Sequence, residues 1–189
     1  MHMRKKIGIF LENRFIDKEI QYYADFFPKE GYEVHFLTRL WGQTQLEFHG
    51  MEEQTPWVVQ ESFEELTEED LTDYAAIIMP AGYVADYLLY EGTPKVKSPA
   101  VCFLERIAKD SKIVKGFICH ALWIAGPLKE TFSGRKVTCH NNIISHVENA
   151  GMIYQDADVY VDDDIVSART GGDYEAFAKE VLICTKKQL

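Results

Sequence analysis

The sequence predicts an α/β fold built around a mostly parallel sheet, and two observations lead to this class. Short apolar runs rich in Ile and Val alternate with segments of helix length along the 189 residues, which is typical of βαβ units. The run 112–118 has the character of a buried strand and leads directly into the apolar segment 119–125, as when a strand turns into a helix. The length favours one domain, 1–189, that buries its own core.

The first third of the chain predicts two strands with a helix between them. The helix over 17–30 follows from apolar residues at helical spacing, among them Ile20 and Phe27, and Gly31 is placed to end it. The flanking strands are expected at 7–11 and 34–37. Residues 39–56 are less regular, and 57–59 is expected to be a short edge strand.

The middle of the chain begins with an acidic stretch whose charges are expected to face solvent. Within it, Thr67 and Asp70 have the spacing of a capping box that opens a short helix. A strand over 74–79 follows, then a short helix near 83–90. Ser98-Pro99 has the N-cap and first-turn proline of a helix that runs to about residue 110 and precedes the strand ending at 118.

The last third predicts a strand over 134–139 and a helix over 143–150 that Gly151 ends. Residues 159–161 and 165–167 are expected to form a hairpin. The three aspartates between them lack the alternating acids, glycine and distal glutamate of a calcium loop, so they predict a turn. A helix over 174–185 completes the fold.

Composition and charge narrow the class of protein. The 20 basic and 30 acidic residues give a formal net charge of −10, which disfavours nucleic acid or an anionic membrane as partner. Four widely spaced cysteines (Cys102, Cys119, Cys139, Cys184) and the lack of a signal peptide or long apolar run predict reduced thiols and a cytoplasmic location. Residues 1–4 are expected to be a cloning remnant or disordered.

The junction at Cys119 is the candidate for chemistry. At a tight turn near the first amides of a helix, partial positive charge favours a thiolate, so we expect a lowered thiol pKa and a nucleophile at neutral pH. Ligands of parallel sheets sit beyond the carboxyl ends of the strands. The turns there bring Glu12, Glu19, Gly82 and His120 toward Cys119. A carboxyl, a glycine amide, an imidazole and a thiol are the parts of a nucleophilic site.

Several blocks in order along the chain resemble signatures of the ThiJ/PfpI superfamily. The specific block is Gly116-Phe117-Ile118-Cys119-His120, and the supporting blocks are 78–82, 134–138, 148–151 and 159–162. The resemblance implies a flavodoxin-like three-layer α/β/α sandwich with a nucleophile elbow, assembled as a homodimer or homohexamer. It also implies deglycase, glyoxalase, peptidase, hydratase or stress-protein roles, with a small carbonyl or amide compound as substrate.

The resemblance also implies residue roles. Cys119 would be the nucleophile, His120 its neighbour, and Glu19 the glutamate that hydrogen-bonds the thiol, although the residues alone favour an exposed carboxylate at position 19. The amides of Gly82 and Ala121 would hold an oxyanion. Asp86 matches an acid that pairs with the histidine across a subunit boundary.

Alternatives remain open from the sequence. The family's Gly-Gly turn is Ala81-Gly82 here, and Ala121 replaces the glycine after Cys-His, so a changed substrate or a site decayed into a binding scaffold is consistent with the sequence. The same thiol also fits a non-enzymatic redox-sensing stress protein. His146 and Glu148 have the spacing of a glutaminase-type amidotransferase, but they fall in a predicted helix and are expected to be surface residues. No cofactor is expected. No metal site is expected either, because His35 and His49 have no partner at metal-ligand spacing and Cys139-His140 is a lone pair of possible ligands.

Overall fold

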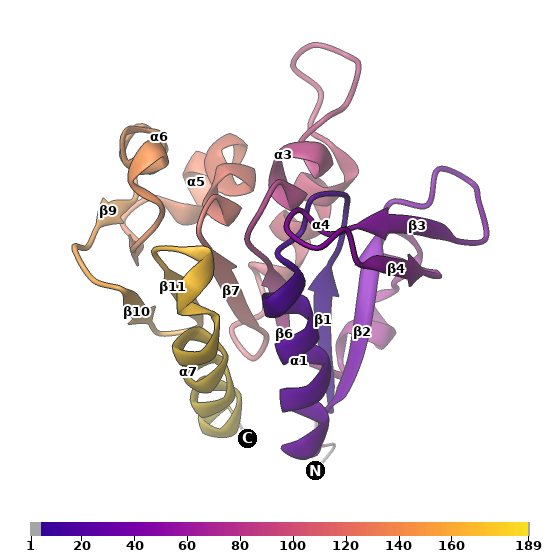
Figure 1. The fold of residues 1–189 in the computed structure, drawn as a ribbon. Helices are drawn as coiled ribbons and strands as arrows, with labels where there is room; N and C mark the ends of the chain where they lie inside the picture. The colour runs from indigo at the N-terminus through magenta and orange to yellow at the C-terminus, as the bar shows by residue number, and fades with distance from the viewer. Residues whose placement is uncertain (1–4, 189) are drawn as a thin grey trace.

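A seven-stranded, mostly parallel sheet forms the centre of the protein (Figure 1). The computed structural model describes residues 5–188. The strand order is β10-β11-β7-β6-β1-β2-β5, and only β10 runs antiparallel to its neighbour β11. Helices α1 and α7 cover one face of the sheet, and α4 lies on the other (Figure 1). The predicted three-layer α/β fold is therefore confirmed. Residues 1–4 lie outside the described part.

The strands of the main sheet lie close to their expected positions. Their bounds are β1 Lys6–Phe10, β2 Glu33–Thr38, β5 Glu61–Ser62, β6 Tyr74–Met79, β7 Val114–Ile118, β10 Val159–Asp162 and β11 Ile165–Ala168. Every residue of β6 and β7 is buried, because helices cover both faces of a parallel sheet. The expected hairpin at 159–167 forms, with Asp162 at the end of β10 and Asp163 and Asp164 in the turn.

Except for α5, which was not predicted, the helices also follow the sequence signals. Their bounds are α1 Asp17–Lys29, α2 Glu68–Leu71, α3 Val84–Leu88, α4 Pro99–Ile107, α5 Lys129–Phe132, α6 Ile144–Asn149 and α7 Tyr174–Lys187. Thr67 and Asp70 form the predicted capping box, and the Ser98 hydroxyl accepts the Val101 amide at the start of α4. Short 3-10 helices cover Phe63–Glu65, Asn141–Ile143 and Gly171–Asp173. None of the described helices has the length and apolar character that crossing a membrane requires.

Three local features differ in detail from the expectations. The strand expected at 57–59 forms as β4 (Pro56–Val59), and it pairs with an unpredicted strand, β3 (Leu46–His49), in a separate antiparallel hairpin. The strand expected over 134–139 shortens to β8 (Lys136–Val137), paired with β9 (Ile153–Tyr154). The segment after Cys119 is a 3-10 helix, Ala121–Leu128, instead of an α-helix.

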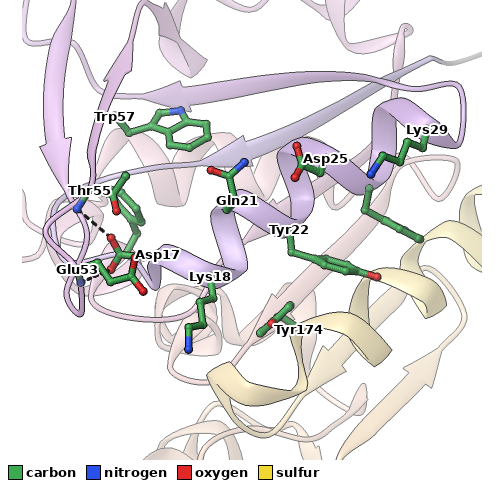
Figure 2. A pocket seen from close by; sticks show the side chains of 12 residues that line it. Asp17, Lys18, Gln21, Tyr22, Asp25, Lys29, Glu53, Thr55, Trp57 and Tyr174 are labelled. Atoms are coloured by element: carbon green, nitrogen blue, oxygen red, sulfur yellow. Dashed lines mark hydrogen bonds between the residues drawn. The ribbon is translucent and has the colours of Figure 1, made fainter.

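Asp17, at the start of α1, holds the loop that joins β3 to β4 (Figure 2). Its carboxylate accepts the backbone amides of Glu52, Glu53 and Thr55 at 2.9–3.1 Å. Burial alone would raise the pKa of Asp17, but the hydrogen bonds from Thr55, Glu52 and Glu53 lower it to about 2. A folded-state pKa below the usual 3.8 means that this carboxylate stabilises the native state above pH 3.8 and loses that effect as the pH falls toward 2.

We therefore expect Asp17→Ala to lower the free energy of unfolding at pH 7 by about 1.5–3 kcal/mol, since hydrogen bonds to a charged acceptor are lost. Urea denaturation of the variant and the wild type would measure this, with the exposed Asp25→Asn on the same helix as control. The difference should shrink when the titration is repeated near pH 2. A difference that is equal at pH 7 and at pH 2 would contradict the proposed role of the carboxylate.

Candidate functional site

Cys119 lies at a sharp turn that begins where β7 ends. Its backbone φ is +63°, in the left-handed region that side chains other than glycine rarely adopt. The Cys119 amide donates to the Ala168 carbonyl at 2.9 Å, and its own carbonyl accepts the His140 amide at 3.1 Å. Backbone bonds on both sides thus hold the residue in a conformation that costs of order 1–3 kcal/mol, a geometry common at functional sites.

Burial and backbone amides act in opposite directions on the Cys119 thiol. Burial raises its pKa above the ordinary value of 9, and the Glu19 carboxyl adds to that rise. The amides of His120, Gly171 and Gly82 point at the sulfur and oppose the rise without cancelling it. The expectation of a lowered pKa was therefore wrong, because the loss of solvent around the sulfur outweighs the amide dipoles. In the free protein at neutral pH, the thiol form dominates.

Glu19 is buried next to the sulfur instead of exposed at the helix start. It has 0% exposure, and both of its carboxyl oxygens accept the Ala81 amide, at 3.0 and 3.2 Å. Burial raises its pKa to about 8, although the nearby Tyr23 hydroxyl and the Ala81 amide oppose the rise. Glu19 is accordingly protonated at neutral pH, so its carboxyl can donate a hydrogen bond or a proton toward the turn at Cys119.

Gly82 closes the turn after β6 against the loop after β1. Its φ is +83°, and a Cβ at this position would lie 2.3 Å from the Arg14 carbonyl oxygen. Only glycine fits both constraints, which lets the Gly82 amide reach the Cys119 sulfur. Ala121 is buried at the start of the 3-10 helix, and its amide is not among those acting on the sulfur. The oxyanion role of Ala121 stays a prediction.

His120 and Asp86 interact electrostatically within the chain. The pKa of His120 is lowered by burial and by His140, against the opposing effect of Asp86, so its ring is neutral at pH 7. Burial raises the pKa of Asp86, and His120 opposes that rise. His120 Nε2 and Asp86 Oδ2 are both shielded from solvent and have no hydrogen-bond partner among residues 5–188. The two groups are within electrostatic reach of each other in one chain.

The structure adds two neighbours that the sequence did not predict. A sulfur or ring nitrogen from each of Cys119, His120 and His140 lies within 4.8 Å of the other two, and the two rings meet edge to face at 4.7 Å. His140 follows β8, so its place at the carboxyl end of a predicted strand was a usable signal. Gly171 belongs to the loop after β11, and only tertiary structure brings its amide to the sulfur.

The other candidate residues and the cavities lie away from the Cys119 thiol. His146 on α6 approaches the Trp123 carbonyl at 3.2 Å instead of the thiol, which agrees with its assignment as a helix surface residue. Glu12 follows β1 beside a cavity of about 210 Å³, and its pKa is raised by burial. A pocket of about 450 Å³ runs along α1, with aromatic walls that include Tyr22 and Trp57 (Figure 2). Neither cavity is lined by Cys119, His120 or His140. Chemistry, not cavity volume, therefore selects the turn at Cys119 as the candidate site.

Comparison with known proteins agrees with the fold. The pattern of the DJ-1/PfpI family matches residues 5–183. The chain belongs to the DJ-1/PfpI family. It is 32% identical to protein/nucleic acid deglycase 2 of Escherichia coli, covering 95% of this chain and 97% of that protein. It is also 30% identical to general stress protein 18 of Bacillus subtilis, covering 98% and 100%.

Among solved DJ-1/PfpI structures, a ThiJ/PfpI domain protein from Brachyspira murdochii superposes with a TM-score of 0.81. The match covers 99% of each chain at 16% sequence identity, so it supports the fold alone.

Proposed function

We propose that this protein is a cysteine-dependent deglycase. It would remove a small α-oxoaldehyde, such as methylglyoxal, from the thiol or amine to which that aldehyde has added. The observation that carries the proposal is the setting of the Cys119 sulfur, which three backbone amides approach and which two imidazoles and a protonated carboxyl surround. The name of the Escherichia coli relative supports the adduct as substrate class. Because that name includes nucleic acid, a nucleotide adduct belongs to the test, and the charge argument against nucleic acid stays a prediction.

The geometry suggests a division of roles. His120, neutral at pH 7, takes the Cys119 proton as the sulfur adds to the adduct's carbonyl carbon, and Asp86 stabilises the imidazolium that forms. The Gly82 amide, and in our proposal that of Ala121, stabilises the oxyanion. The carboxyl of Glu19 supplies a proton at neutral pH. The raised thiol pKa is consistent with this order, since proton transfer accompanies attack instead of preceding it.

Substrate assays test the proposal. Methylglyoxal adducts of N-acetylcysteine, N-acetyllysine and guanosine would be incubated with the protein, and proton NMR would follow recovery of the free thiol or amine. We expect recovery faster than the spontaneous reversal measured with heat-denatured protein. Rates equal to spontaneous reversal for all three adducts would contradict the proposal. Cleavage of a fluorogenic peptide without adduct repair would assign the site to amide hydrolysis instead.

One observation also favours the second candidate, a redox-sensing stress protein. A protonated Glu19 can donate a hydrogen bond to a sulfinate on Cys119, and the Bacillus subtilis relative is named as a stress protein. Mild peroxide followed by peptide mass analysis distinguishes the candidates, because a sensor gains oxygen selectively at Cys119. Self-association and a cytoplasmic location, which the resemblance and the cysteine pattern predict, stay predictions.

A further inference from the structure

We propose that Cys119, His120 and His140 form a binding site for a zinc-class cation, and that the bound cation blocks the nucleophile reversibly. Nothing in the spacing of these residues along the chain predicted the site, since residue 140 lies 20 positions beyond the Cys-His pair. The turn after β7 and the loop after β8 bring them together through the hydrogen bond between the His140 amide and the Cys119 carbonyl.

Distances and ligand types support a metal of this class. The three ligand atoms lie within 4.8 Å of one another. Bonds of about 2.3 Å to sulfur and about 2.0 Å to nitrogen place the ligand atoms of a tetrahedral zinc roughly 3.3–3.7 Å apart. Side-chain rotations that move the ligand atoms by about 1 Å would therefore bring them to coordination distance. A thiolate with two imidazoles suits zinc, cobalt or copper and does not suit magnesium or calcium. Three protein ligands leave a fourth position open to water.

A second observation comes from His120. Its Nε2 is buried and has no hydrogen-bond partner in the described part of the chain, which is an unfavourable state for a polar atom. A metal bound through Nε2 would satisfy that atom. The amides of Gly82, His120 and Gly171, which point at the sulfur, would stabilise the metal-bound thiolate as outer-shell donors.

Metal binding would break one hydrogen bond within the protein and release one proton. The Asn142 amide donates to His140 Nδ1 at 3.2 Å, which places the ring proton on Nε2. Coordination through Nε2 moves that proton to Nδ1 and turns the exposed Asn142 amide toward solvent. The S–H bond of Cys119 breaks, its proton leaves to solvent and an S–metal bond forms, with no oxidation. The thiolate then shares one of its lone pairs with the metal, which withdraws negative charge from the sulfur and makes it a weaker nucleophile toward a carbonyl.

Cobalt absorption and zinc competition test the site without reference to turnover. We expect one Co²⁺ per wild-type chain, with a thiolate-to-cobalt charge-transfer band, and displacement of Co²⁺ by Zn²⁺. The band should vanish in Cys119→Ser and in Cys119→Ala, and His140→Gln should weaken binding at least about tenfold. Cys102→Ser and His146→Gln, which change an exposed thiol and a histidine outside the cluster, should bind as the wild type does. Circular dichroism would show that each variant is folded.

Alkylation tests the block itself. Saturating Zn²⁺ should slow iodoacetamide modification of Cys119 at least about tenfold, read by peptide mass, and leave the modification of Cys102 unchanged. A cobalt band that persists without Cys119, wild-type affinity in His140→Gln, or no binding at all would overturn the site. The inhibitory consequence, though not the binding, rests on the proposed function, and a protein that binds zinc but repairs no adduct would refute that function alone.

Discussion

Cys119→Ser is expected to lower kcat/KM for adduct repair by at least about 10³-fold, because the variant removes the nucleophile. A serine hydroxyl is far less acidic than a thiol, and the neutral His120 that accepts the thiol proton is too weak a base to activate it. Burial, which already raises the pKa of the thiol, would disfavour a charged oxygen further. The serine side chain fits the same turn with little change in volume, so the loss would be one of chemistry.

The matched control is Cys102→Ser, since Cys102 is exposed on α4 and away from the turn. Steady-state rates of adduct repair for the wild type and both variants would be compared, with thermal unfolding to show that each protein is folded. We expect the Cys102 variant to retain full activity. Activity of Cys119→Ser within tenfold of the wild type would show that the reaction does not proceed through this sulfur.

Asp164→Ala is expected to lower the free energy of unfolding by about 3–5 kcal/mol, because it leaves a buried cation without its carboxylate. Lys115 on β7 is 2% exposed and Asp164 in the β10–β11 turn is 4% exposed, and the two form an ion pair. Lys115 also donates to the Asp110 carbonyl, and Arg135 bonds Asp164 from the other side. Burial lowers the pKa of Lys115, and Asp164 opposes that change, so the variant must bury an unpaired ammonium or remove its proton.

Urea denaturation at pH 7 measures this effect. Asp163→Asn is the control, because residue 163 is exposed in the same turn and asparagine tolerates its φ of +56°. The double variant Lys115→Met with Asp164→Leu should recover most of the lost stability, since two apolar side chains replace the whole pair. A loss below about 1 kcal/mol in Asp164→Ala would show that solvent and the Asp110 carbonyl compensate Lys115 for the missing carboxylate, since Arg135 carries the same charge as Lys115.

The sequence predicted the central elements because their signals are local. Both ends of β6, Tyr74 and Met79, were predicted correctly, because six apolar residues lie between clear turn signals. The β3–β4 hairpin was missed in part because Leu46–His49 is short and its pattern is weak. The 3-10 geometry after Cys119 has no comparable local signal: the segment is apolar and helix-length, and Gly126 and Pro127 come late in it.

The sequence could predict only those site residues that directly follow a predicted strand. Cys119, His120 and Gly82 could be selected because each follows a predicted strand, whereas the burial of Glu19 depends on packing against Ala81, 62 residues away. The direction of the Cys119 pKa shift could not be predicted, because it depends on how much solvent the folded protein removes. Gly171 reaches the sulfur only through the pairing of β11 with β7.

Main-chain hydrogen bonds to the Ala168 carbonyl and from the His140 amide hold the backbone that carries the Cys119 sulfur. Such anchoring survives the exchange of almost any surrounding side chain, provided that the strands keep their register. Lineages can then drift apart in sequence and inherit one placement of the sulfur, while the loops above it change and admit new compounds.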